Sequence, residues 1–142
     1  MSFKVNKTKT MSNSIIMRSF NCSFIDFMTD ILSIFPENQD IRNGINSFEL
    51  IKRVNPTIII KVWYMNIYTP YHDIIQQGDI SFFFEKDYTQ DLTLLSNATD
   101  IMFIIDKIRD PIKTMSDENK KHTMKYIQIL SELSNVYMRN KM

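Results

Sequence analysis

Residues 24–36 read FIDFMTDILSIFP, and this stretch predicts the class of the fold. Its apolar side chains recur every three or four residues, which places them on one face of an α-helix. They are Phe24, Phe27, Met28, Ile31, Leu32 and Phe35. Pro36 lacks a backbone N–H donor and is expected to end this helix. The folded part of the chain should begin near Ile15.

Further helices are expected downstream, because turn residues interrupt the same spacing. Asn38 can cap a second helix, whose buried stripe contains five apolar residues. They are Ile41, Ile45, Phe48, Ile51 and Val54. The pair Asn55-Pro56 is expected to cap and start a third helix. The β-branched residues 57–60 would also suit a buried strand, but the cap favours a helix.

Three residues in the middle of the chain are expected to interrupt, end or start helices. Pro70 should kink or divide the third helix, and Gly78 should end it in the left-handed conformation. Asp79 is then expected to cap a short element. That element contains consecutive phenylalanines at 82–84, which are too many for one narrow helical stripe.

The C-terminal third predicts two more helices. Asp100 can cap a helix that Pro111 breaks. Ser116 can start a last helix that runs nearly to Met142. We therefore predict an all-α, compact multi-helix domain of roughly five to seven helices over residues 14–142. A flexible polar arm at residues 1–13 should precede it.

The composition limits the classes of protein that this chain can represent. Its 142 residues are 44% hydrophobic and carry a net charge of +1, so they can fill a core but create no strong phosphate-binding field. No apolar run reaches the roughly 18–20 residues that span a bilayer. Residues 1–10 are polar and basic, unlike a signal peptide. We expect an intracellular protein with no membrane partner.

The residue types that bind metals and nucleotides are sparse. Cys22 is the single cysteine and His72 and His122 are the two histidines, so no zinc-ligand spacing is recognisable. Neither glycine-rich phosphate-binding pattern, GxGxxG or GxxxxGK followed by Ser or Thr, occurs in the sequence. We predict no cofactor, no metal and no catalytic residue.

Four segments form a pattern over residues 20–92. They are Phe20-Asn21-x-x-Phe24-x-x-Phe27-x-x-Asp30 to Phe35-Pro36, Asn55-Pro56 to Lys61-x-Trp63, Tyr71 to Ile75, and Gly78-Asp79-x-x-Phe82-Phe83-x-x-Lys86-Asp87-Tyr88-x-x-Asp91-Leu92. The pattern resembles small, largely uncharacterised helical proteins of the nucleocytoplasmic large DNA viruses. The resemblance implies an all-α fold and a viral origin, with a place in the virion or the host cytoplasm. It implies a virion or assembly role and transfers no catalytic residue.

Two groups of side chains are candidates for contacts with a protein partner. The last helix could present an outward apolar face for oligomerisation, and the segment 78–88 could add aromatic contacts. The residues concerned are Met124, Val136, Tyr137, Met138, Phe84 and Tyr88. Packing in the core is the interpretation that we favour for both groups.

Two groups of lysines are candidates for phosphate contacts. The first group lies near the N-terminus and the second on the last helix. They are Lys4, Lys7, Lys9, Lys120, Lys121 and Lys125. Acidic residues interrupt the second group, so ordinary solvent-exposed charge is the favoured explanation and nucleic acid is not the favoured partner.

Three small groups of polar residues could suggest catalysis or metal binding, but each has a simpler structural explanation. Asp26 and Asp30 lie one helical turn apart, as paired carboxylates would, but no third ligand accompanies them. His72 and Asp73 are neighbours, and neighbouring side chains on a helix point apart. Cys22 is expected to be buried and not reactive.

The sequence thus predicts a non-enzymatic structural or protein–protein interaction protein. Its partners would be copies of itself, as a homo-oligomer, or other virion proteins. The alternative is a nucleic-acid-associated or regulatory factor that uses the basic residues at both ends.

Overall fold

Helices are the regular secondary structure of the part that the structure, a computed structural model, describes. This part comprises residues 12–85 and 98–141 and contains no strand. The elements are α2 (Asn13–Ile34), α3 (Gln39–Val54), α4 (Ile58–Trp63), the π-helical segment η1 (Tyr64–Tyr68), α5 (Thr69–Gln77), α6 (Ser81–Glu85), α7 (Ala98–Lys113) and α8 (Asp117–Lys141). The predicted all-α class is therefore confirmed.

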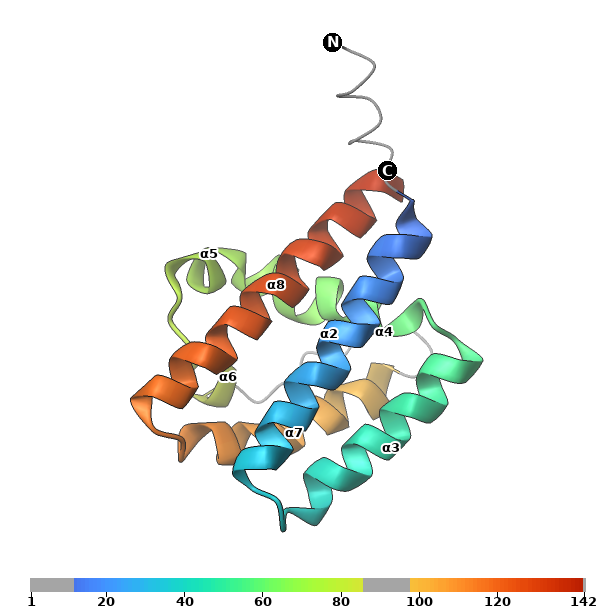
Figure 1. The fold of residues 1–142 in the computed structure, drawn as a ribbon. Coiled ribbons are helices and arrows are strands. Elements are labelled where there is room, and N and C mark those ends of the chain that lie inside the picture. The colour runs from blue at the N-terminus through green and yellow to red at the C-terminus, as the bar shows by residue number, and fades with distance from the viewer. Residues whose placement is uncertain (1–11, 86–97, 142) are drawn as a thin grey trace.

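The two longest helices, α2 and α8, lie side by side and form the centre of the fold (Figure 1). They run in opposite directions, because Asn140 near the end of α8 donates to Asn13 at the start of α2 at 3.0 Å. Helix α3 packs against α2 and α7, whereas α4, η1 and α5 pack against α8. Of the predicted arm, residues 1–11 lie outside the described part of the chain.

The aromatic side chains that the sequence places on these helices form the core. Trp63 is fully buried, and its ring lies 6.1 Å from Phe20, 6.0 Å from Phe24 and 6.5 Å from Phe83 between ring centroids. The indole Nε1 donates a hydrogen bond to the Ser131 hydroxyl at 3.0 Å. Residues from α2, α4, α6 and α8 thus meet around one side chain, which ties distant parts of the chain together.

Most helix ends are where their capping residues predict them. The Asn38 side chain accepts from the backbone N–H of Ile41 at 3.0 Å, and Ser116 accepts from Asn119 at 3.2 Å. Asp79 accepts from the backbone N–H of Ser81 at 3.0 Å. Gly78 has a φ of 78°, the left-handed conformation expected at the end of a helix. Local chemistry therefore sets these four boundaries.

Proline acts differently at its two positions in the helices. Downstream of Pro70 the expected kink is present, since Tyr71 has a non-helical φ of −126° and ψ of 17° inside α5. Pro111, in contrast, does not break α7 as predicted but lies within its last turn. Its missing N–H costs a single intrahelical bond there, because the helix ends at Lys113 in any case.

Two predicted helix starts and one predicted buried residue are wrong. Asn55 does not cap the third helix, because its side chain accepts from the Thr57 hydroxyl at 3.2 Å and α4 begins only at Ile58. Asp100 lies inside α7 and does not precede it. Val54, assigned to the buried stripe of α3, is 82% exposed, because it is the last residue of the helix and no described element covers it.

Candidate functional site

The apolar face predicted on α8 turns inwards. Met124 and Tyr137 are buried core residues, and Val136 and Met138 are half-buried against the same core. Helix α8 packs on α2 and on α4, η1 and α5, and these contacts cover the four residues named above. The outward face expected there is therefore not present. The Phe84 side chain and Tyr88 lie outside the described residues.

Exposed apolar side chains gather instead on α3 and α7. Leu50 of α3 is 59% exposed and Phe103 of α7 is 53% exposed. Both line a groove of about 410 Å³ between the two helices. Val54, which follows Leu50 by one helical turn, extends the apolar surface along α3. A half-exposed phenylalanine beside an exposed leucine is the kind of apolar patch that marks contact with another molecule.

A glycine forms the floor of this groove. A Cβ atom at Gly44 would lie 3.2 Å from both the Ile104 Cγ2 and the Met28 Cε atoms, so α3 approaches α7 and α2 closely at this point. Ile104 and the half-buried Ile51 line the groove beside Gly44. Because a side chain at this position would crowd Ile104 and Met28, glycine is what allows α3 to pack this closely against α7 and α2.

Charged residues surround the apolar centre. Asp40 from α3 and Asp100 and Lys107 from α7 line the groove and are exposed. Asp100, Phe103 and Lys107 are three and four residues apart and so share one face of α7. No ion pair joins these charged groups to each other or to the other described residues. An apolar centre with a polar rim is the usual composition of a protein–protein interface.

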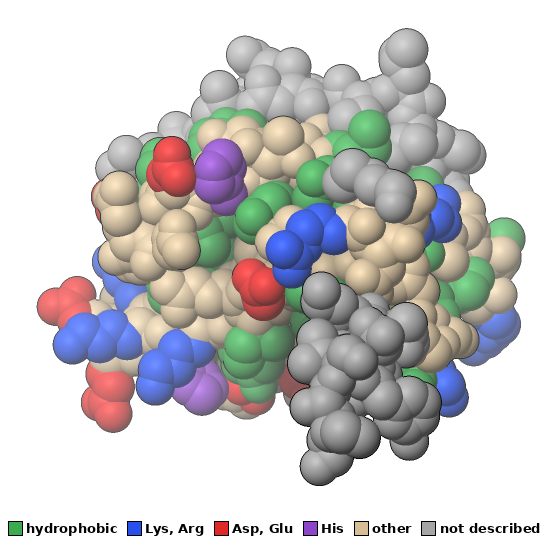
Figure 2. Space-filling model, turned by 90° about the horizontal axis from the view of Figure 1, so that it is seen from above, with side chains coloured by type: hydrophobic (Ala, Val, Ile, Leu, Met, Phe, Trp, Pro, Cys, Tyr) green, Lys and Arg blue, Asp and Glu red, His purple; other side chains and the backbone are tan. Residues whose placement is uncertain are grey.

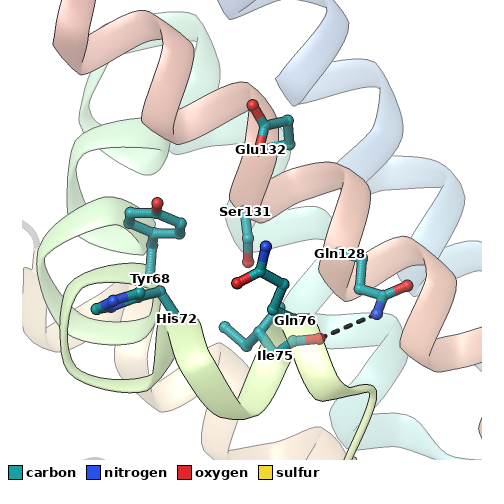
Figure 3. A pocket seen from close by; sticks show the side chains of 7 residues that line it. All are labelled: Tyr68, His72, Ile75, Gln76, Gln128, Ser131 and Glu132. Atoms are coloured by element: carbon teal, nitrogen blue, oxygen red, sulfur yellow. Dashed lines mark hydrogen bonds between the residues drawn. The ribbon is translucent and has the colours of Figure 1, made fainter.

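A second, polar cleft of about 200 Å³ lies between η1 and α5 on one side and α8 on the other (Figure 3). Gln128 donates to the backbone carbonyl of Ile75 at 2.9 Å across it. Burial, followed by the negative charge of Glu132, raises the pKa of Tyr68 above its usual value of 10.0. The Ser131 hydroxyl in this cleft accepts the Trp63 N–H and so has a structural function.

His72 lines the edge of the same cleft. Its Nε2 atom lies 3.3 Å from the Asp73 carboxylate, so the expectation that these neighbours point apart is wrong. The pair follows the non-helical residue Tyr71, where the regular helical geometry is interrupted. Both side chains are largely exposed, and no hydrogen bond links the described His72 to a serine or cysteine.

Of the two acidic residues Asp26 and Asp30, the second makes contacts with α8. Asp30 accepts a hydrogen bond from the Tyr126 hydroxyl at 2.8 Å and lies 3.3 Å from the His122 Nε2 atom. Burial, followed by the hydrogen bond to Asp30, raises the pKa of Tyr126 to about 12. Asp30 therefore joins α2 to α8, which its sequence spacing to Asp26 does not reveal. In residues 12–85 and 98–141, no cluster of three or more His, Cys, Asp or Glu could hold a metal ion.

Cys22 is exposed, contrary to the expected burial. It lies two residues after Phe20 and two before Phe24, and both phenylalanines are fully buried. A residue midway between two such positions points to the opposite side of a helix. The thiol therefore faces solvent.

The lysines of α8 lie on an open groove of about 510 Å³. Lys120, Lys121 and Lys125 line it together with Asp117 and Gly78. On the face seen in Figure 2, basic and acidic side chains are likewise interspersed. Lys4, Lys7 and Lys9 lie outside the described residues. The described lysines therefore form no uniformly positive surface.

No family of known proteins, no curated protein and no solved structure matches this chain. Across the described helices, none combines the length and the apolar character needed to cross a bilayer.

Proposed function

We propose that this chain is a non-enzymatic structural or protein–protein interaction protein that receives a helix of its partner in the groove between α3 and α7. One observation carries the proposal. Leu50 and Phe103 are each more than half exposed, and both line the groove of about 410 Å³ between α3 and α7. Covering them removes apolar surface from water, and an amphipathic helix is the usual occupant of a groove between two helices.

The proposal includes a place in the virion of a large DNA virus or in its assembly. The resemblance of residues 20–92 to small helical proteins of these viruses supports this part. An assembly component binds neighbouring proteins through surfaces of this kind, with an apolar centre and a charged rim.

The proposal can be tested by photo-crosslinking from within the groove. The full-length protein, with p-benzoylphenylalanine in place of Phe103, is irradiated in the cells that naturally produce it. Ile129 on α8 is the matched control position, because it is 50% exposed and lies outside the groove. We expect crosslinked protein from position 103 and little from position 129.

A second substitution shows whether the crosslink depends on the groove. Leu50→Glu places a charge on the α3 side of the groove, whereas Phe103 lines the groove from α7. This charge should remove most of the crosslinked product. Equal crosslinking from positions 103 and 129, or none from position 103, would show that the groove is not a binding surface.

A further inference from the structure

The exposed face of α7 carries charges of opposite sign on either side of an apolar residue. Asp100 and Lys107 lie at equal distances along the helix from the midpoint between Phe103 and Ile104. When a second α7 runs in the opposite direction about this midpoint, its lysine therefore lies opposite the aspartate of the first. At about 1.5 Å per residue, the two charged positions are roughly 10 Å apart along the helix axis. Neither has an ion-pair partner among the described residues. This face is complementary to an antiparallel copy of itself.

From this symmetry we propose that the occupant of the groove is α7 of a second copy of this chain, in a two-fold symmetric dimer. The inference rests on the proposed function and names its partner. A two-fold axis near the midpoint brings Asp100 opposite the partner's Lys107, and Lys107 opposite the partner's Asp100. A parallel arrangement in register would place like charges together, so the charges select the antiparallel orientation.

The groove supplies the shape that such a dimer needs. A two-fold interface uses the same surface on both copies, so each copy must offer both a projecting side chain and a place to receive one. Phe103 projects from α7, and the groove of about 410 Å³ between α3 and α7 can receive the partner's Phe103. Dimerisation would therefore cover Phe103 and Leu50 of both copies, the two apolar side chains that the groove leaves exposed.

Charge exchange tests the dimer with the full-length protein. Asp100→Lys and Lys107→Asp each place like charges opposite each other at both ends of the interface. Each variant alone should have a dimer dissociation constant raised by about tenfold or more. An equimolar mixture of the two restores both attractive pairs in a heterodimer, and so does the double variant. Both should return to within about threefold of the original chain.

Sedimentation and light scattering measure these constants, and circular dichroism checks that each variant remains helical. Lys125→Asp is the control, because Lys125 is an exposed lysine of α8 outside this groove, and it should leave the dimer unchanged. Dimerisation of the single variants as strong as that of the original chain would overturn the antiparallel arrangement. A mixture no tighter than its components would do the same.

The photo-crosslink at position 103 separates failure of this inference from failure of the proposed function. A product of twice the chain mass of 16.9 kDa supports the dimer. A product with a different protein, together with an original chain that stays monomeric, would refute the dimer and leave the groove as a protein-binding site. No product at all would refute both.

Discussion

Replacement of Ser131 by alanine should destabilise the fold through a single hydrogen bond. Ser131 is buried, and its hydroxyl accepts the N–H of the fully buried Trp63 at 3.0 Å. Without this acceptor the indole N–H remains buried and unsatisfied, which costs about 1–3 kcal/mol. Alanine favours a helix over serine by about 0.5 kcal/mol, which offsets part of this loss. We therefore expect Ser131→Ala to lower the free energy of unfolding by about 1–2 kcal/mol.

The matched control is the nearby Ser134→Ala. Ser134 is also buried on α8, but its hydroxyl donates to the backbone carbonyl of Ser131 in the same helix at 2.7 Å. This hydrogen bond uses a carbonyl of the same helix and does not connect α8 to another element. Its loss should therefore change the free energy of unfolding by less than about 0.5 kcal/mol. The two variants delete the same atom three residues apart.

Urea denaturation measures the difference. Trp63 is the only tryptophan, so its fluorescence reports the core directly. For a urea dependence of about 2 kcal/mol per M, Ser131→Ala should lower the midpoint by roughly 0.5–1 M relative to the original chain. Equal midpoints for Ser131→Ala and Ser134→Ala would refute the argument that the Trp63 bond stabilises the core.

Three further predictions concern other parts of the structure. Phe48→Ala should cost about 3–5 kcal/mol of unfolding free energy in the same assay, because Phe48 is fully buried and stacks on Phe24 at 4.6 Å; a loss below about 1 kcal/mol would contradict this packing. Gly78→Ala should lower the melting temperature at a cost of about 1 kcal/mol, because a φ of 78° disfavours any side chain, whereas an unchanged temperature would argue against the left-handed cap. In an alkaline titration followed by tyrosinate absorbance, Tyr126 should ionise near pH 12 and Tyr126→Phe should remove that step. Because burial and the bond to Asp30 raise this pKa from about 10, the associated stability is present below pH 10 and is lost as the pH rises towards 12; if Tyr126→Phe instead removed a step near pH 10, the raised pKa would be refuted.

The helical class and several helix ends could be predicted because they depend on nearby residues. The caps at Asn38 and Ser116 act within three residues, and the left-handed turn at Gly78 depends on its own backbone. Errors arose where two local preferences competed. Asn55-Pro56 has the composition of a helix start, but the Asn55 side chain bonds to Thr57 and α4 begins later.

The candidate site could not be predicted from periodicity. An apolar residue on a helix is equally consistent with a core and with an interface, and the neighbouring helices decide between them. Met124 and Tyr137 became core residues because α2 and the α4–α5 region cover α8. Leu50 offered one signal, since it lies outside the stripe formed by Ile41, Phe48 and Ile51 and so has no place in the core predicted for α3.

Local sequence patterns were sufficient to predict the helical class, the N-terminal caps of α3 and α8, and an aromatic core. These properties follow from hydrogen bonds and apolar spacing within a few residues, so they do not depend on distant parts of the chain. Only the tertiary packing brings Phe103 and Leu50 to the same groove and Asp30 to Tyr126. Such contacts join residues far apart in the chain, and they depend on how the helices pack, which no local pattern encodes.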